Sequence, residues 1–194
     1  MRKIILSFTI MLLILVISSC NIQIENKWDK ALKDDVLDNY TVTLIRPESD
    51  SISVIYKKDG NIAYYKQFPL YDNGCYRIEE IEMYWYLDDE GKNWEIEYDN
   101  TDGVWYKKEV DYTSLDNYGR KAATSMVTDF SLFKFNSENN CYKAQIGHFE
   151  LNVYFDGPRL SKITSTVENY TESLEFSDYG NVKLILPETI VNMN

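Results

Sequence analysis

The sequence has little of the side chains on which many enzymes and metal sites depend. His148 is the single histidine among 194 residues, so a His-rich metal site is excluded and a Ser-His-Asp triad would have to use this side chain. The chain contains no glycine-rich phosphate loop, nucleophile elbow or Cys-x-x-Cys pair. Carboxylates are plentiful, but their spacing singles out no glycosidase pair. We therefore predict no cofactor, and a hydrolytic enzyme is the third of our hypotheses.

Glycine, proline and basic residues are also scarce. Eight Gly and four Pro beside 16 Tyr and four Trp indicate a globular chain. The chain has 20 Lys and Arg against 31 Asp and Glu, and loss of Arg2 and Lys3 would leave 18 against 31, a formal charge of −13. Nucleic-acid binding depends on basic patches, so we expect no nucleic-acid partner. An anionic membrane surface would repel the same acidic body.

An apolar run at residues 4–17 follows two basic residues at the start of the chain. It is shorter than the about 20 residues that cross a bilayer, and the small residues Ser18 and Ser19 follow it, as in a secretory signal. Ile17-Ser18-Ser19-Cys20 resembles a bacterial lipobox. The resemblance implies cleavage between Ser19 and Cys20 and a lipid on the Cys20 thiol, which would anchor the protein on the extracytoplasmic face of the bacterial cell membrane. The alternatives are an ordinary cleaved signal and an uncleaved anchor.

The chain then divides into a signal peptide at 1–19, a lipidated tether at 20–26 and a single domain at 27–194. With Cys20 lipidated, Cys75 and Cys141 remain. Outside the cytoplasm these two cysteines can form a disulfide; otherwise they are two unrelated thiols. Both alternatives stay open, because the pairing of cysteines cannot be read from a sequence.

Hydrophobic periodicity predicts an α+β fold. One face of a first short helix carries Trp28, Ala31, Leu32 and Val36. Alternating apolar and polar segments with short turns then indicate an antiparallel meander. A second helix interrupts the meander, with one face formed by Leu115, Tyr118, Ala122, Met126 and Phe130. Strands resume at Phe149 and end with Val182 to Leu186, so we expect about nine strands and two helices.

This order of elements resembles the half-barrel lipoproteins of the LolA and LppX type. The resemblance is carried by Asn39-Tyr40-Thr41, Phe176-Ser177-Asp178-Tyr179-Gly180 and Leu184-Ile185-Leu186-Pro187-Glu188. It implies a strongly curved sheet around an apolar cavity, with the two helices packed on its concave face as a lid and acyl chains as cargo. One departure matters, because the inner faces here are rich in Trp and Tyr, which would fill the hollow that a carrier keeps open.

Two acidic turns, residues 88–91 and 99–103, offer oxygen atoms at alternate positions. They lack the later Glu of a calcium loop, so turn chemistry explains them and we predict no metal site.

Aromatic residues form a strip along the meander, namely Tyr84, Trp85, Tyr86, Trp94, Tyr98, Trp105 and Tyr106. The strip is either a ligand-binding face or ordinary core, and we favour core for Trp85 and Trp94. If a ligand is bound, the residues that we expect to face it are Trp85, Trp94, Tyr118, Met126 and Phe130.

Our leading hypothesis is a membrane-anchored, non-enzymatic lipoprotein that shelters a hydrophobic ligand, such as an acyl chain or lipid, between sheet and helices. The alternative is a cell-surface structural or protein-interaction lipoprotein with a filled core and no small ligand. The two hypotheses differ in whether the space behind Trp85, Trp94 and Met126 is hollow or filled.

Overall fold

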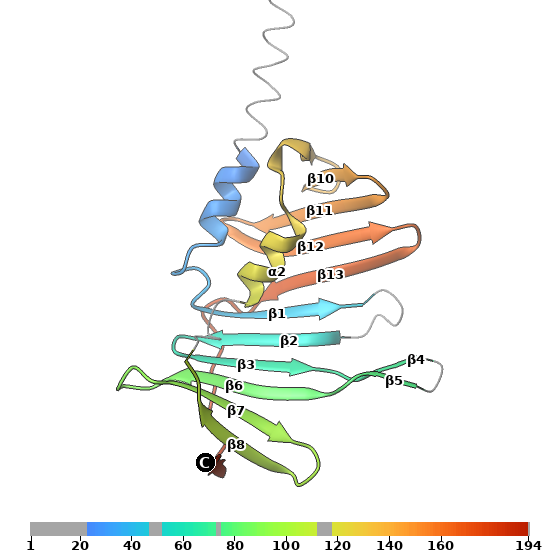
Figure 1. Ribbon diagram of the computed structural model, residues 1–194. Coiled ribbons are helices and arrows are strands. Elements are labelled where there is room, and N and C mark those ends of the chain that lie inside the picture. Colours follow the sequence, from blue (N-terminus) through green and yellow to red (C-terminus); the bar gives the residue numbers. More distant parts are fainter. Residues whose placement is uncertain (1–22, 47–51, 73–74, 112–117, 194) are drawn as a thin grey trace, which may run out of the picture.

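The computed structural model describes residues 23–46, 52–72, 75–111 and 118–193, with the backbone alone over 70–72 and 75–77. Its main feature is an open, curved sheet of 12 strands in the order β14-β8-β7-β6-β3-β2-β1-β13-β12-β11-β10-β9 (Figure 1). Neighbouring strands run antiparallel, except that β14 lies parallel to β8. A short hairpin, β4–β5, forms a separate two-stranded sheet.

The strands of the first half of the chain are β1 (Asn39–Ile45), β2 (Ile52–Asp59), β3 (Ile62–Gln67), β4 (Leu70–Asp72), β5 (Cys75–Ile78), β6 (Ile81–Leu87), β7 (Asn93–Asp99) and β8 (Val104–Glu109). The helix α2 (Tyr118–Met126) and the 3₁₀ turn η1 (Phe130–Leu132) follow. The remaining strands are β9 (Lys134–Asn136), β10 (Cys141–Ile146), β11 (Phe149–Asp156), β12 (Arg159–Val167), β13 (Tyr170–Ser177) and β14 (Ile190–Asn192).

Strand β1 lies in the middle of the sheet and joins two antiparallel meanders. Val42 pairs with Tyr56 of β2 on one side and with Phe176 of β13 on the other. The face of the sheet that carries Val42 and Tyr40 contacts the helices, and we call it the helix face. The opposite face is called the outer face.

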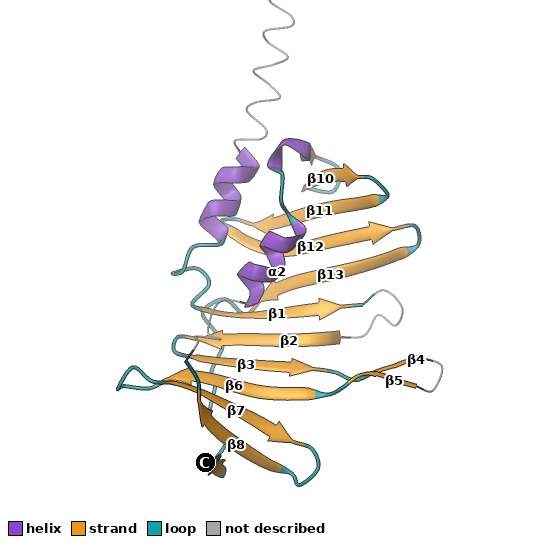
Figure 2. Cartoon of the chain, in the orientation of Figure 1, coloured by secondary structure: helices purple, strands orange, loops and turns teal. Residues whose placement is uncertain are grey.

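The N-terminal helix covers residues 23–31 of the described chain and packs on the helix face (Figure 2). Trp28 is buried as expected, and so are Ala31 and Leu32. The expected tether at 20–26 is wrong over its last residues, because residues 23–26 are helical and Ile24 is completely buried. In the sequence Ile24 lies between Gln23 and Glu25, and one apolar residue among polar ones is too weak a periodic pattern to predict that the helix begins this early.

Helix α2 buries its smallest residues against the sheet. Gly119 and Ala123 are its buried positions, while Tyr118, Ala122 and Met126 flank them and pack against the core. A Cβ atom at Gly119 would lie 2.8 Å from the Tyr40 ring and from Val42 Cγ2, so only glycine permits this close approach. Phe130, expected on the same helical face, lies beyond the end of α2 in η1.

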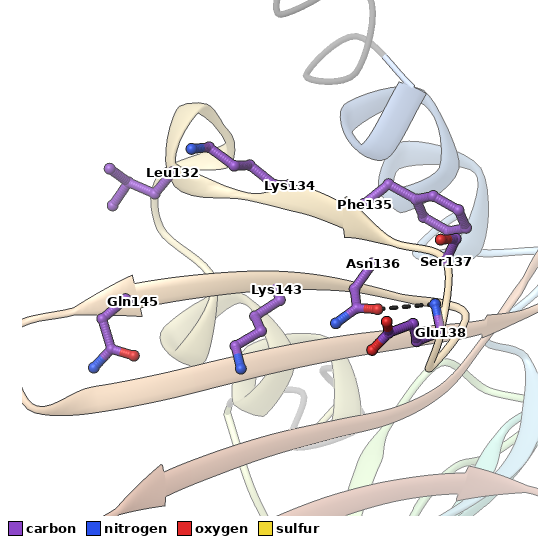
Figure 3. A pocket seen from close by; sticks show the side chains of 8 residues that line it. All are labelled: Leu132, Lys134, Phe135, Asn136, Ser137, Glu138, Lys143 and Gln145. Carbon is purple, nitrogen blue, oxygen red and sulfur yellow. Dashed lines mark hydrogen bonds between the residues drawn. The ribbon is translucent and has the colours of Figure 1, made fainter.

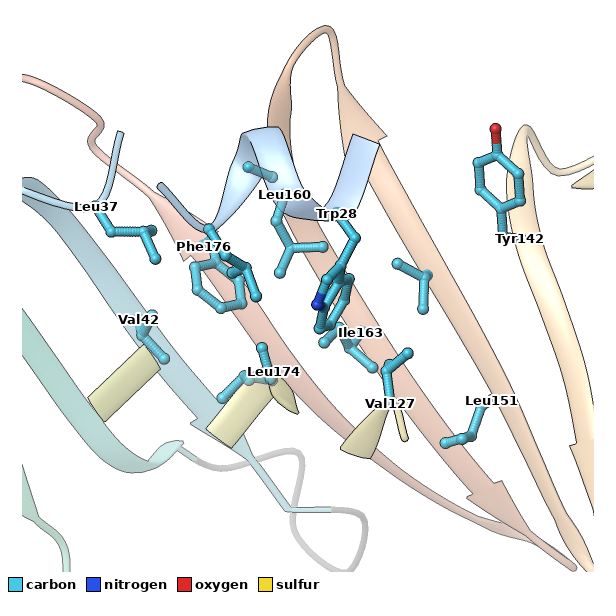
Figure 4. Close-up of a cluster of buried hydrophobic side chains, with 14 of the residues drawn as sticks. Trp28, Leu37, Val42, Val127, Tyr142, Leu151, Leu160, Ile163, Leu174 and Phe176 are labelled. Atoms are coloured by element: carbon cyan, nitrogen blue, oxygen red, sulfur yellow. The ribbon is translucent and has the colours of Figure 1, made fainter. Parts of the chain in front are cut away.

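A single hydrophobic core fills the space between the two helices and β1 and β10–β13. Figure 4 shows Trp28 of the N-terminal helix among side chains of the sheet, including Ile163 and Leu174. Tyr40, Leu160 and Ile163 have no measurable exposure to solvent. This part of the interior is therefore packed with side chains, as the alternative hypothesis requires.

The predicted α+β class with an antiparallel sheet and two helices is confirmed, and the open curved sheet is compatible with a half-barrel. The predicted strand number is wrong, since the main sheet has 12 strands and not about nine. The strands β9 and β14 could not be predicted, because each has three residues and so few positions show no clear alternation of apolar and polar side chains.

The expected strand from Val182 to Leu186 is also wrong. Residues 182–187 have no regular structure, and two of their backbone N–H groups donate to side chains instead of a neighbouring strand. The N–H of Val182 donates to Asn39 Oδ1 at 2.8 Å, and that of Leu184 donates to Asp59 Oδ2 at 3.0 Å.

Within residues 23–193 as far as they are described, no helix is both long enough and apolar enough to cross a membrane.

Candidate functional site: a groove beside helix α2

A mainly apolar concave region lies beside α2 on the helix face. One hollow of about 400 Å³ is lined by Leu44, Tyr118, Lys121, Ala122, Ser125, Met126, Glu172 and Leu174. A second hollow of about 300 Å³ is lined by Met126, Thr128, Ile146, Phe149, Leu151, Ser165 and Glu172. Because Met126 and Glu172 border both hollows, we treat them as one open trough, the α2 groove.

Strand register explains why these side chains line one trough. Glu172 of β13 pairs with Ser165 of β12, which pairs with Leu151 of β11. The three residues therefore form a row across the sheet on the helix face. With Leu44 on β1 and Ile146 on β10 at its ends, the groove crosses five neighbouring strands, a span of ~19 Å at ~4.8 Å between strands.

The charged groups of the groove are few. Glu172 borders both hollows, and Lys121 of α2 lines the first. Burial raises the pKa of Tyr118 to about 12, and the nearby Tyr65 and Glu172 add to the shift. The Tyr118 hydroxyl therefore stays protonated at physiological pH and can donate a hydrogen bond at one end of an apolar surface.

Three of the five residues expected to face a ligand lie on the helix face near α2. Tyr118 and Met126 line the groove. Phe130 instead packs edge-on against Trp28, with 5.7 Å between ring centroids, and so belongs to the filled core.

Trp85 and Trp94 do not line the groove. Trp85 lies on the helix face, where its Nε1 donates to Glu95 Oε2 at 2.9 Å. Glu95 is only 6% exposed and also forms an ion pair with Lys108 at 2.7 Å. The space behind Trp85 is thus occupied by a charged network.

The expectation that Trp94 faces the same space is wrong. Trp85 pairs with Glu95 across β6 and β7, so the adjacent Trp94 points to the outer face. There Trp94 Nε1 donates to Asp88 Oδ2 at 2.7 Å, and Lys107 Nζ lies 3.7 Å from the ring centroid. The sequence could not supply this result, because the length of the turn sets the register between the two strands.

The aromatic strip is accordingly divided between the two faces. On the outer face, ring contacts with centroid distances of 4.9–5.4 Å link four residues, Tyr64, Tyr84, Trp105 and Tyr98. Tyr86 and Trp94 stack beside them at 6.4 Å. We call these six residues the outer aromatic face. All six are half-buried, so they cover β3 and β6–β8 as a layer.

The two acidic turns behave as turns. Asp88 Oδ1 accepts the backbone N–H groups of Glu90 and Lys92 at 2.9 and 2.8 Å, and Asp99 accepts that of Thr101 at 2.7 Å. Among the described residues, no three His, Cys, Asp or Glu side chains gather in a way that could hold a metal ion. His148 is exposed in the turn between β10 and β11.

The Cys141 side chain is buried on β10, and burial raises the pKa of its thiol. The side chain of Cys75 lies outside the described residues, as do Ser19 and Cys20, so the disulfide and the lipidation stay predictions. Strand order weighs against the disulfide, because β11, β12, β13, β1 and β2 separate β10 from β3, the strand that leads into the β4–β5 hairpin.

No protein-family model matches this chain, and no curated protein matches it in sequence. The function is therefore argued from the site alone.

Proposed function

We propose that this protein is a membrane-anchored extracytoplasmic lipoprotein that binds an apolar chain, such as an acyl chain, without covalent chemistry. The observation that carries the proposal is the α2 groove, an open trough that is mainly apolar and crosses five strands. The site differs from our first expectation, because the ligand would lie in a groove beside α2 and not in a hollow between helices and sheet.

Burial would supply the binding energy. An extended apolar chain in the groove would contact Leu44, Met126, Leu151 and Leu174 and gain ~25 cal/mol for each Å² of apolar surface removed from water. Phe149 is 50% exposed beside the groove, so a ligand would also cover an aromatic side chain that now faces water. Lys121 and the Tyr118 hydroxyl can receive a polar end group.

A lipid on Cys20 would act as the anchor. Cys20 and the first described helical residue are three Cα–Cα steps apart, which limits their separation to ~11 Å. The folded body would therefore sit close to the bilayer, which would be the source of an acyl ligand.

A second candidate function is supported by the outer aromatic face. Tyr and Trp side chains provide a large contact area with polar tips, and six of them lie together on the face that no helix of the described chain covers. In this case the protein would be a surface interaction lipoprotein whose partner is a protein or an envelope polymer.

Replacement of one residue in the floor of the groove tests the first function. Ser165→Phe would place a bulky ring between Met126 and Leu151, and we expect it to weaken binding of the fluorescent fatty acid cis-parinaric acid by about tenfold, or ~1.4 kcal/mol. Thr166→Phe is the matched control, because Thr166 neighbours Ser165 on the same strand but lies on the outer face. Equal affinities of the two variants would show that the groove is not the site.

The anchor is tested separately. Cys20→Ala removes the thiol that would carry the lipid, so we expect the variant to leave the membrane fraction of a bacterial lysate. Cys141→Ala, which removes a buried thiol, serves as the control and should remain in the membrane. A Cys20→Ala protein that stays with the membrane would refute lipid anchoring.

A further inference from the structure

The end of the molecule where the described chain begins is also the end that carries β9. Figure 1 shows the N-terminal helix, η1 and β9 together at this end, with β8 and the C-terminus at the other. Ring contacts connect them, since Trp28 packs on Phe130 at 5.7 Å and Lys27 Nζ lies 5.6 Å from the centre of the Tyr142 ring. Phe135 of β9 packs on the same Tyr142 at 5.3 Å. A lipid on Cys20 would thus hold the β9 edge near the bilayer.

This edge carries apolar and basic side chains on its two faces, because Phe135 pairs with Tyr142 on the helix face and Lys134 pairs with Lys143 on the outer face. Leu132 is 43% exposed and Phe135 is 46% exposed, and both line an open hollow of about 690 Å³ together with Lys134, Lys143 and Gln145 (Figure 3). We call these five residues the β9 edge surface. Amphipathic helices that lie in a membrane interface likewise combine exposed apolar side chains with lysines.

The two lysines of this surface lie directly opposite each other, as Lys134 pairs with Lys143 across β9 and β10. Like charges in this position are destabilising. Lys143 is partly compensated by an ion pair with Glu150 at 2.7 Å, and Glu138 borders the same hollow. No described carboxylate forms an ion pair with Lys134, although the chain as a whole has a formal charge of −11. An anionic partner would relieve this repulsion.

We propose that the β9 edge surface docks on the anionic surface of the membrane, with Leu132 and Phe135 in the interface and Lys134 and Lys143 on lipid phosphates. This inference rests on the proposed anchoring at Cys20. The acidic body as a whole would be repelled by such a membrane, but this end of it would be attracted. Each lysine near an anionic bilayer shifts the docking equilibrium by about fivefold, and the anchor supplies a high local concentration.

Docking would also set the direction of the α2 groove. Gln145 lines the hollow at the β9 edge, and its neighbour Ile146 lines one end of the groove. The groove end at Ile146 and Phe149 would therefore be the end nearer the bilayer, where an acyl chain could pass between membrane and protein.

Hydrogen exchange of the full-length protein, purified from membranes and reconstituted into vesicles, tests the docking. In vesicles with equal amounts of phosphatidylglycerol and phosphatidylcholine, we expect amide exchange over residues 132–145 to be at least about fivefold slower than in phosphatidylcholine alone. The variant Leu132→Asp with Lys134→Glu should lose this difference, because it replaces an apolar side chain with a charged one and reverses the charge of a lysine. The variant should still fold, because both side chains are exposed.

The matched control is Ile185→Asp with Lys183→Glu. It also replaces an apolar residue with Asp and a lysine with Glu two positions apart, but outside the β9 edge surface. Ile185 is 83% exposed and Lys183 is also exposed, and this pair should retain the protection. Equal exchange in both kinds of vesicle, or protection that survives in the β9 edge variant, would overturn the docking. The mass of the N-terminal peptide separates the two proposals: unmodified Cys20 would overturn both, whereas acylated Cys20 with an unprotected edge would overturn the docking alone.

Discussion

Tyrosine side chains form much of the contact between α2 and the sheet. The Tyr118 ring lies 5.5 Å from Tyr56 and 5.7 Å from Tyr65, and Tyr40 packs on Tyr56 and Tyr179. Burial raises the pKa of Tyr40, Tyr65 and Tyr179 above the ordinary value and that of Tyr118 to about 12. Ionisation of these phenols is therefore coupled to unfolding.

The sign of this coupling predicts instability at high pH. Unfolded tyrosines lose their protons near pH ~10, whereas the buried ones keep theirs, so the unfolded chain binds fewer protons above that pH. The contribution of the protonated, buried tyrosines to the free energy of unfolding is fully present below pH ~10. For Tyr118 it is lost as the pH rises through about 12. Urea unfolding at neutral pH and near pH ~11 should show a lower free energy of unfolding at the higher pH.

Absorbance of the phenolate band supplies the check. We expect a subset of the 16 tyrosines to ionise only when the protein unfolds. If all of them titrated near pH ~10 in a protein that is still folded, the packing of these rings would be contradicted.

At the scale of elements, the largest buried side chain of the N-terminal helix is that of Trp28. Trp28 is 4% exposed and packs on Phe130, and truncation of a buried aromatic side chain typically costs ~3–5 kcal/mol. We expect Trp28→Ala to lower the free energy of unfolding by about this amount in urea titrations. Lys30→Ala, on the exposed side of the same helix, should change it by less than ~0.5 kcal/mol. Similar effects of both variants would mean that the helix is not docked through Trp28.

Periodicity predicted those elements whose alternation is long and clean. Strand β6 reads Ile81, Met83, Trp85 and Leu87 at every second position, and it was predicted over its full length. Strand β10 was missed, because its helix-face residues include the small Ala144 and its outer-face residues include the apolar Cys141. The contrast between the two faces, which is the signal in a sequence, is low there.

The candidate site was predicted only in part, for a different reason. Tyr118 and Met126 could be named because a helical face is set by local spacing alone. The floor of the groove, from Glu172 through Ser165 to Leu151, depends on the register of three strands. A register depends on turns and on pairing partners that are distant in the sequence, and no pattern within one strand contains it.

At the scale of the whole molecule, the open sheet has two edges, and β14 covers one of them. Ile190–Asn192 pair in parallel with residues 105–107 of β8, and the Met193 N–H donates to the Lys107 carbonyl at 2.8 Å. This short strand shields the longer β8, whose free edge would otherwise offer unpaired backbone groups to another chain.

Removal of residues 190–194 should therefore make the protein associate with itself. We expect light scattering after size exclusion to show dimers or larger species that increase with protein concentration. Removal of Asn194 alone keeps the described pairing and serves as the control. A truncated protein that remains monomeric over the same concentration range would show that β14 does not protect the edge.

The central place of β1 has a consequence for the order in which the chain folds. Val42 pairs with Phe176, so the seam between the two meanders joins residues 134 positions apart, whereas within each meander the connections between successive paired strands span at most 14 positions, as from Gln67 to Ile81. Loop closure becomes costlier with length, and contacts between distant residues slow folding. During synthesis the N-terminal part of the chain emerges first, so β1 can pair early with β2. The other edge of β1 can pair only after β13 has been synthesised. We therefore expect the two halves to form first and their union along β1 to be the slow step.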